Sequence, residues 1–138
     1  MSDQEAKILL IDDEKDVVDT LERILLFENL KCDKTTDPDR AVELMNEKMY
    51  DVIITDIMMP GLSGIKILKI AKSINPLCHV IVITGYSTVS TVYESITRGA
   101  FDFFVKPFDD LDGILKTVSL SIGRIRRWQL LIKDKSFS

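Results

Sequence analysis

Cysteine and histidine are scarce in this chain of 138 residues, which has two of the former and one of the latter. Cys32 and Cys78 are too few and too far apart for a disulfide framework or a cysteine metal site, so we expect two buried, reduced thiols. His79 opens a predicted strand, and we expect it to have a structural or edge role and no catalytic one. Sites built from thiols or imidazoles are therefore not expected.

Long apolar runs and an excess of basic residues are also missing. No apolar run approaches the roughly 18 residues that a membrane-spanning helix needs, and the polar, acidic start MSDQEAK does not resemble a signal peptide. The formal net charge is −4, which gives no indication of nucleic-acid binding by the domain. A Gly-rich nucleotide loop is missing as well. We expect a cytoplasmic protein without direct nucleic-acid binding and without a membrane association.

Short apolar runs alternate with longer segments of helical periodicity along the whole chain. This alternation predicts an α/β fold with a parallel sheet and helices on both faces, in a single domain. Asp37 and Pro38 are typical of a helix start, and Gly99 is typical of a helix end. The predicted strands are residues 7–11, 30–36 (an edge strand), 51–55, 79–83 and 101–105; the predicted helices are residues 15–28, 37–49, 64–75, 87–98 and 109 onward.

Polar residues directly follow the predicted strands, where an open α/β sheet binds its ligands. Asp12 and Asp13 follow the first strand, Asp56 ends the third, Thr84 follows the fourth and Lys106 follows the fifth. Right-handed connections bring these strand ends to one edge, so we expect the five side chains to share one pocket.

The three carboxylates suit a hard cation such as Mg²⁺, and three like charges require one. An aspartate can attack phosphorus to give an aspartyl phosphate, while an ammonium and a hydroxyl group offset charge on the transferring group. Taken alone, each residue also has an ordinary explanation: Asp12 or Asp13 as a helix cap, Thr84 in a turn, Asp56 in a loop, and Lys106 on the surface. Their coincidence at the strand ends favours a functional site.

Four segments resemble the receiver domain of two-component response regulators in residues, order and spacing. They are ILLIDDE, DVIITDIMMPGLSG, VIVITGYS and GAFDFFVKPF, and the resemblance runs from residue 7 to about residue 120. The sequences of these segments are most similar to the receivers of NtrC-like regulators, which precede sigma-54-activating ATPase domains. The resemblance implies a flavodoxin-like (CheY-like), doubly wound sheet of five parallel strands in the order 2-1-3-4-5.

The resemblance also implies the roles of the strand-end residues. Asp56 would be the phosphoacceptor, and Mg²⁺ would be held by Asp12, Asp13, Asp56 and the backbone carbonyl of Met58. Lys106 and Thr84 would contact the phosphoryl group. Such a domain is a signalling module and not an enzyme with an external substrate, although it catalyses phosphoryl transfer to, and hydrolysis from, its own aspartate.

A switch is implied as well, in which the Thr84 hydroxyl moves toward the phosphoryl group and the Phe103 ring turns inward. Phe103 lacks a tyrosine hydroxyl, so only packing can carry its signal, and an ordinary core role is the alternative. The resemblance suggests a cis peptide between Lys106 and Pro107. Met58 and Tyr86 flank the expected phosphoryl position, and we expect them to hinder water and slow hydrolysis; an indifferent loop pair is the alternative.

The implied partners are a sensor histidine kinase as phosphodonor, with a small acyl phosphate as a substitute, and an output domain or effector protein. The output surface would comprise residues 87–98, residues 101–105 and the last helix. Residues 87–98 are rich in Ser, Thr and Val, which is typical of a movable helix. A homodimer would use the same surface or the C-terminal helix.

The last predicted helix exceeds about 35 Å at ~1.5 Å per residue, so it would overrun the domain. We expect residues 1–120 to form the receiver domain and residues 121–138 to extend its last helix. Its second half, GRIRRWQLLIK, is basic. A dimerising coiled coil, a linker to an output domain, a surface for an acidic partner and a merely solvated helix end are all compatible with it; we favour the linker or dimerisation stalk.

Two other functions compete with the phosphorylation switch. One is a receiver-like domain that works through protein contacts without turnover. The other is an aspartate-based phosphatase, which would need a second acid two residues after its nucleophile, where this chain has Met58, and a substrate-cap insertion for which there is no room.

Overall fold

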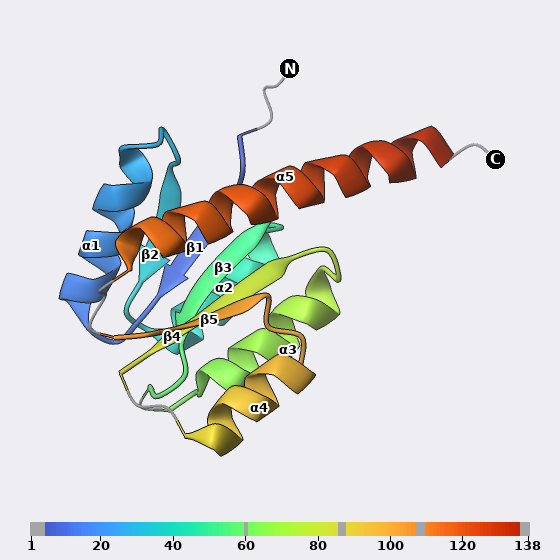
Figure 1. Cartoon of the computed structure of the whole chain (residues 1–138). Helices are drawn as coiled ribbons and strands as arrows, with labels where there is room; N and C mark the ends of the chain where they lie inside the picture. Colours follow the sequence, from blue (N-terminus) through green and yellow to red (C-terminus); the bar gives the residue numbers. More distant parts are fainter. Residues whose placement is uncertain (1–4, 60, 86–87, 107–109, 136–138) are drawn as a thin grey trace.

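The computed structural model describes residues 5–59, 61–85, 88–106 and 110–135. In this part of the chain, strands and helices alternate (Figure 1). The strands are β1 (Ile8–Ile11), β2 (Cys32–Thr35), β3 (Val52–Asp56), β4 (His79–Thr84) and β5 (Asp102–Val105), and the helices are α1 (Lys15–Leu26), α2 (Pro38–Glu47), α3 (Gly64–Ile74), α4 (Val89–Thr97) and α5 (Leu111–Lys135).

The strands form one parallel sheet in the order β2-β1-β3-β4-β5, which confirms the predicted fold class. Helices α1 and α5 cover one face, and α2, α3 and α4 cover the other (Figure 1). Strands β1, β3 and β4 are buried along their whole length, because neighbours flank them on both sides and helices cover both faces. Alternate residues of these strands enter two core clusters, one on each face.

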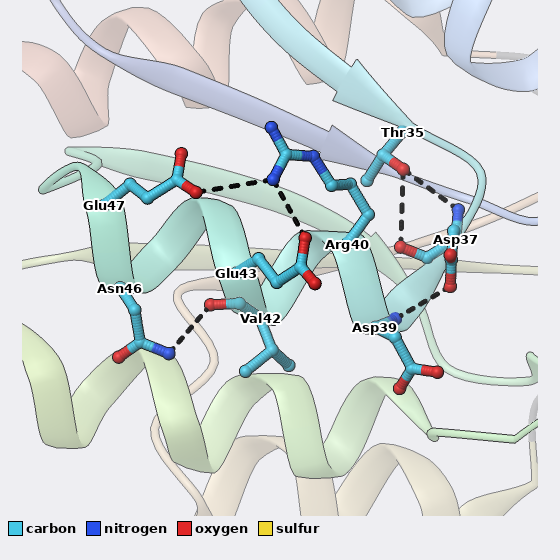
Figure 2. A network of polar contacts seen from close by, with 8 residues as sticks. All are labelled: Thr35, Asp37, Asp39, Arg40, Val42, Glu43, Asn46 and Glu47. Carbon is cyan, nitrogen blue, oxygen red and sulfur yellow. Dashed lines mark hydrogen bonds and ion pairs between the residues drawn. The ribbon is translucent and has the colours of Figure 1, made fainter.

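Local sequence signals explain where the helices begin and end. Asp37 accepts a hydrogen bond from the Asp39 N–H at 2.9 Å and Pro38 is the first residue of α2, as predicted (Figure 2). Thr88 caps α4 by a reciprocal arrangement with Thr91, so α4 starts at residue 89. Gly99 follows α4 with a φ of +99°, a conformation that favours glycine.

Helix α5 is one continuous helix of 25 residues, about 37 Å long, and its C-terminal part extends past the sheet (Figure 1). Packing against the sheet continues beyond residue 120, since Ser121 and Ile125 are buried. The exposed apolar residues near its end are Leu130, Leu131 and Ile132. No break in the helix marks the expected division at residue 120, so that division stays a prediction. Within the described residues, no helix is long and apolar enough to cross a membrane.

His79 lies at the start of β4 and contacts α5. Its Nδ1 is 2.5 Å from Ser121 Oγ, its ring stacks on Phe101 with centroids 4.1 Å apart, and the Trp128 ring meets it edge-on at 5.3 Å. Arg124 lies over the other ring of this stack, 5.3 Å from the Phe101 centroid. Burial, with smaller effects of nearby positive charges, lowers the pKa of His79 to about 4. His79 is therefore a neutral residue that packs between β4 and α5, in agreement with the structural role expected from the sequence.

Both cysteines are free thiols, but only one fits the expectation of burial. Cys78 is buried, whereas Cys32 is half-buried because it lies on the edge strand β2. Burial raises the pKa of each thiol to about 12, so both are protonated and unreactive.

Candidate functional site

Four carboxylates meet at the carboxyl edge of the sheet. Asp12 follows β1 and Asp56 ends β3, and these strands are adjacent with Ile11 opposite Thr55, so the two carboxylates are brought side by side. Asp12 and Asp56 are buried, whereas Asp13 and Glu14 are exposed. One carboxylate oxygen from each of the four residues lies within 4.8 Å of the others. The three predicted carboxylates therefore do converge, and Glu14 joins them.

Lys106 extends from the end of β5 into this cluster. Its Nζ lies 2.8 Å from Asp12 Oδ2, 2.9 Å from Glu14 Oε1 and 3.1 Å from Asp56 Oδ2. Its backbone N–H donates to the Thr84 carbonyl at 2.8 Å, which fixes the end of β5 beside β4. Burial would lower the pKa of Lys106, but its contacts with the three carboxylates outweigh burial and raise it. The ammonium group is thus a fixed positive charge among the acids.

Asp12 is the most deeply buried carboxylate of the cluster. Its side chain is fully buried, and burial raises its pKa to about 6 although the contacts with Lys106 and with the Glu14 N–H oppose this. Among the described residues, its Oδ2 accepts no hydrogen bond of good geometry and has only the ion pair with Lys106. A buried, under-coordinated carboxylate oxygen in an all-oxygen donor set fits a hard cation such as Mg²⁺.

The backbone after Asp56 is held by the start of α3. The Asp56 carboxylate accepts the Met58 N–H at 3.1 Å, and the Ile57 carbonyl accepts the Gly64 N–H at 2.9 Å. A Cβ atom on Gly64 would lie 2.0 Å from the Asp56 carbonyl oxygen, so no other residue fits without movement. The Met58 side chain is 53% exposed beside the site. A role of its carbonyl as a metal ligand stays a prediction.

Thr84 and Phe103 share one face of the sheet. Val82 pairs with Phe103 and Thr84 pairs with Val105, so the alternation of side chains puts Thr84 on the face that Val82 and Phe103 occupy. Thr84 is buried and Phe103 is half-buried on the face covered by α3 and α4. The other phenylalanines of this segment, Phe101 and Phe104, pack on the opposite face, toward α5. Of Phe101, Phe103 and Phe104, it is therefore Phe103 that shares the face of Thr84.

Three predictions concern residues outside the described part of the chain. They are the shielding role of Tyr86, the cis peptide between Lys106 and Pro107, and the start of the fourth predicted helix at residue 87. Asp110 is described and caps α5 by accepting the Gly113 N–H at 2.8 Å.

The family model of the response regulator receiver domain matches residues 8–119. The chain belongs to the response regulator receiver domain family. It is 32% identical over 126 residues to the transcriptional regulatory protein ZraR of Klebsiella oxytoca, covering 91% of this chain and 28% of that protein. It is 31% identical over 126 residues to the DNA-binding transcriptional regulator NtrC of Escherichia coli K12, covering 91% and 27%.

Among solved structures, the receiver domain resembles the beryllofluoride-activated NtrC4 receiver domain dimer, with a TM-score of 0.80 and 30% identity over 86% of this chain and 98% of that one. The expected likeness to NtrC-like receivers is confirmed. A receiver is a module of two-component signal transduction and not an enzyme with an external substrate. The chain spans about a quarter of the length of the curated relatives.

Sequence reasoning overlooked two residues of this receiver site. Glu14 directly follows the acidic pair in ILLIDDE, but a glutamate before a helix is usually a solvated first-turn residue, and its contact with Lys106 bridges 92 positions. Gly64 is the first residue of the predicted helix 64–75, but no local pattern indicates that its missing Cβ makes room for the Asp56 carbonyl. The roles of both residues can be recognised only from interatomic distances in the folded structure.

Proposed function

We propose that the receiver domain is switched by transfer of a phosphoryl group from a sensor histidine kinase to Asp56. The observation that supports this most is that the ammonium group of Lys106 lies within 3.1 Å of the carboxylates of Asp12 and Asp56. The three residues come from the ends of three different strands. A buried carboxylate beside a fixed cation is the arrangement that aspartyl phosphate formation needs.

In the proposed reaction, one carboxylate oxygen of Asp56 forms a bond to phosphorus. The bond between phosphorus and the leaving atom of the donor breaks, and its electron pair departs with the donor. The Met58 N–H holds Oδ1 of Asp56, and Lys106 offsets negative charge at Oδ2. Mg²⁺, held by Asp12, Asp13, Asp56 and the Met58 carbonyl, would supply further compensation of charge.

We propose Thr84 and Phe103 as the residues that respond to the phosphoryl group. The Thr84 hydroxyl moves toward a phosphoryl oxygen, and Phe103 follows into the space on the same face of the sheet. Phe103 is half-buried and therefore has room to change its burial. Because it packs on the face covered by α4, its movement changes the α4–β5–α5 surface.

The proposed output surface carries an exposed apolar stripe. Val89, Tyr93 and Ile96 lie on one side of α4 and are 87%, 69% and 59% exposed, and Val105 of β5 is 53% exposed. Such a stripe fits a protein partner, either an output domain or effector or a second copy of this chain. The NtrC4 receiver is described as a dimer and NtrC as a DNA-binding regulator, which supports a homodimer and a transcriptional output. Because the proposed partners act in the cytoplasm, we propose a cytoplasmic location for the protein.

Phosphorylation is tested with acetyl phosphate and Mg²⁺ and measured by intact mass. We expect one labile phosphoryl adduct in the parent protein and none in Asp56→Asn. Asp39→Asn, which changes an exposed aspartate on α2, is the matched control and should be labelled like the parent. An unlabelled parent, or an adduct that survives in Asp56→Asn, would exclude the proposed function.

A further inference from the structure

Glu14 supplies Lys106 with a third carboxylate that the proposed reaction does not use. Its Oε1 accepts a hydrogen bond from Lys106 Nζ at 2.9 Å, a distance between those of the Asp12 contact (2.8 Å) and the Asp56 contact (3.1 Å). The ammonium group donates hydrogen bonds to Glu14 and Asp56 and has a further ion pair with Asp12. Any further acceptor must therefore compete with these carboxylates for Lys106.

The Glu14 side chain is free to make and to break this contact. Glu14 is the N-cap of α1, but its side chain accepts no capping hydrogen bond from the described first turn of that helix. Its backbone is nevertheless fixed to the site, because its N–H donates to Asp12 Oδ1 at 2.9 Å. The backbone thus keeps the Glu14 side chain near Lys106, while no contact with the start of α1 holds its carboxylate.

Burial decides which of the three carboxylates can release Lys106. The Glu14 side chain is 63% exposed, whereas those of Asp12 and Asp56 are 0% and 6% exposed. Glu14 can turn into water and keep its charge solvated, but a buried aspartate that lost Lys106 would retain an unpaired charge in the protein. The contact with Glu14 is therefore the one that opens most easily.

We propose that Glu14 is a positioning residue that holds Lys106 in the unmodified domain and competes with the incoming phosphoryl group for it. This inference rests on the proposed phosphorylation of Asp56. In the unmodified domain, the Glu14 carboxylate occupies one Lys106 donor and places a further negative charge in the path of an anionic phosphodonor. When the phosphoryl group arrives, Glu14 turns out to solvent and Lys106 binds a phosphoryl oxygen instead. Glu14 consequently favours the unphosphorylated state.

The expected effect is modest, because one partner of the ion pair is exposed. Exposed ion pairs have an influence that corresponds to about a two- to five-fold change in an equilibrium or rate. Removing the Glu14 charge should therefore accelerate phosphorylation by about two- to five-fold. The binding of beryllofluoride, an unreactive substitute for the phosphoryl group, should tighten by a similar factor.

The test compares Glu14→Gln with Glu43→Gln, which removes an equally exposed glutamate whose ion pair with Arg40 lies on α2 (Figure 2). Phosphorylation by acetyl phosphate is measured at saturating Mg²⁺, in low salt and in about 1 M salt, where charge interactions are screened beyond about 3 Å. We expect Glu14→Gln to react two- to five-fold faster than the parent in low salt and by a smaller factor in high salt, where the repulsion of the donor is screened but the 2.9 Å contact is not. Glu43→Gln should match the parent in both, and thermal melting should show that both variants fold.

Equal rates for Glu14→Gln and Glu43→Gln would overturn the proposal. A slower Glu14→Gln with weakened Mg²⁺ binding would overturn it too, since Glu14 would then be a metal ligand. If acetyl phosphate labels neither the parent nor the variants, the proposed function fails instead. The contact itself is then decided by the hydrogen exchange of the Lys106 ammonium group, followed by NMR at low temperature and assigned by its loss in Lys106→Met. Faster exchange in Glu14→Gln supports the holding role, and unchanged exchange excludes it.

Discussion

Replacing Gly64 by alanine tests how tightly α3 positions the phosphoacceptor. The added Cβ would lie 2.0 Å from the Asp56 carbonyl oxygen, 2.7 Å from the Ile57 Cα and 2.8 Å from the Asp56 carbonyl carbon. All three are backbone atoms, so no flexible side chain can give way. Since real Cβ atoms keep at least 3.0 Å from such atoms, the backbone of Asp56 must move by about 1 Å.

The magnitude follows from two opposing effects. Gly64 has no positive φ, so alanine alone would stabilise the start of the helix by about 0.5–1 kcal/mol through the unfolded chain. Overpacking against backbone costs about 1–3 kcal/mol or more and outweighs this gain. We expect a net loss of about 1–2 kcal/mol, which lowers Tm by roughly 3–10 °C for a domain of this size. A displacement of about 1 Å at a reacting group also slows phosphorylation by about 10- to 100-fold.

Thermal unfolding and acetyl phosphate labelling measure the two effects, and Gly123→Ala is the control. Gly123 lies inside α5, where a methyl group would meet no described atom beyond its own helical turns within 4 Å. That change should raise Tm by roughly 2–5 °C, because alanine is about 0.5–1 kcal/mol better than glycine in a helix. If Gly64→Ala is as stable and as reactive as the parent, the close contact does not position Asp56.

Three further predictions concern other parts of the fold. The pKa of His79 is lowered to about 4 from an unfolded value near 6.5, so its contribution is present above pH 6.5 and is lost as the pH falls toward 4. When the pH is lowered from 7 to 4.5, the free energy of unfolding, measured with urea, should fall by about 2–3 kcal/mol more in the parent than in His79→Asn. An equal dependence of that free energy on pH in both proteins would contradict this. Ile125→Ala should cost about 2–4 kcal/mol by urea unfolding because Ile125 is buried, whereas Ile132→Ala, at an exposed position, should cost less than about 0.5 kcal/mol. Similar costs would mean that α5 does not pack on the sheet beyond residue 120. Met58→Asn should lose its phosphoryl group faster than the parent in a mass-spectrometric time course, and an unchanged or slower loss would rule out shielding by Met58.

The sequence predicts β1, β3, β4 and β5 to within a residue at each end, and β2 less closely. Strands β1, β3 and β4 are continuous apolar runs because both of their faces are covered, and their positions are predicted to within a residue. Strand β2 is predicted as residues 30–36 but spans Cys32–Thr35, since an edge strand that contains Asp33 and Lys34 has weaker limits in its pattern. Helix α5 is predicted well, because its apolar spacing persists beyond residue 120.

The sequence predicts the residues of the candidate site that the sheet topology places, but not those that depend on individual side-chain contacts. The side chains of Asp12, Asp13, Asp56 and Lys106 are brought together, and Thr84 is placed at the same edge, because the topology brings the ends of parallel strands to one edge of the sheet. Contacts that depend on side-chain reach or on one close approach have no local signature. The ion pair of Glu14 and the fit of Gly64 belong to this second kind.

The order in which the charges of the site occur along the chain has a consequence for biosynthesis. Asp12, Glu14 and Asp56 all precede Lys106, which lies at the end of the last strand and is bonded to each of them. A ribosome that has delivered the first four strands has therefore supplied the acids without their lysine, and the nascent sheet carries their repulsion. Docking of β5 at the sheet edge relieves this repulsion at the same moment as it completes the pocket. A chain that ends before residue 106 thus carries these acids without the charge that balances them.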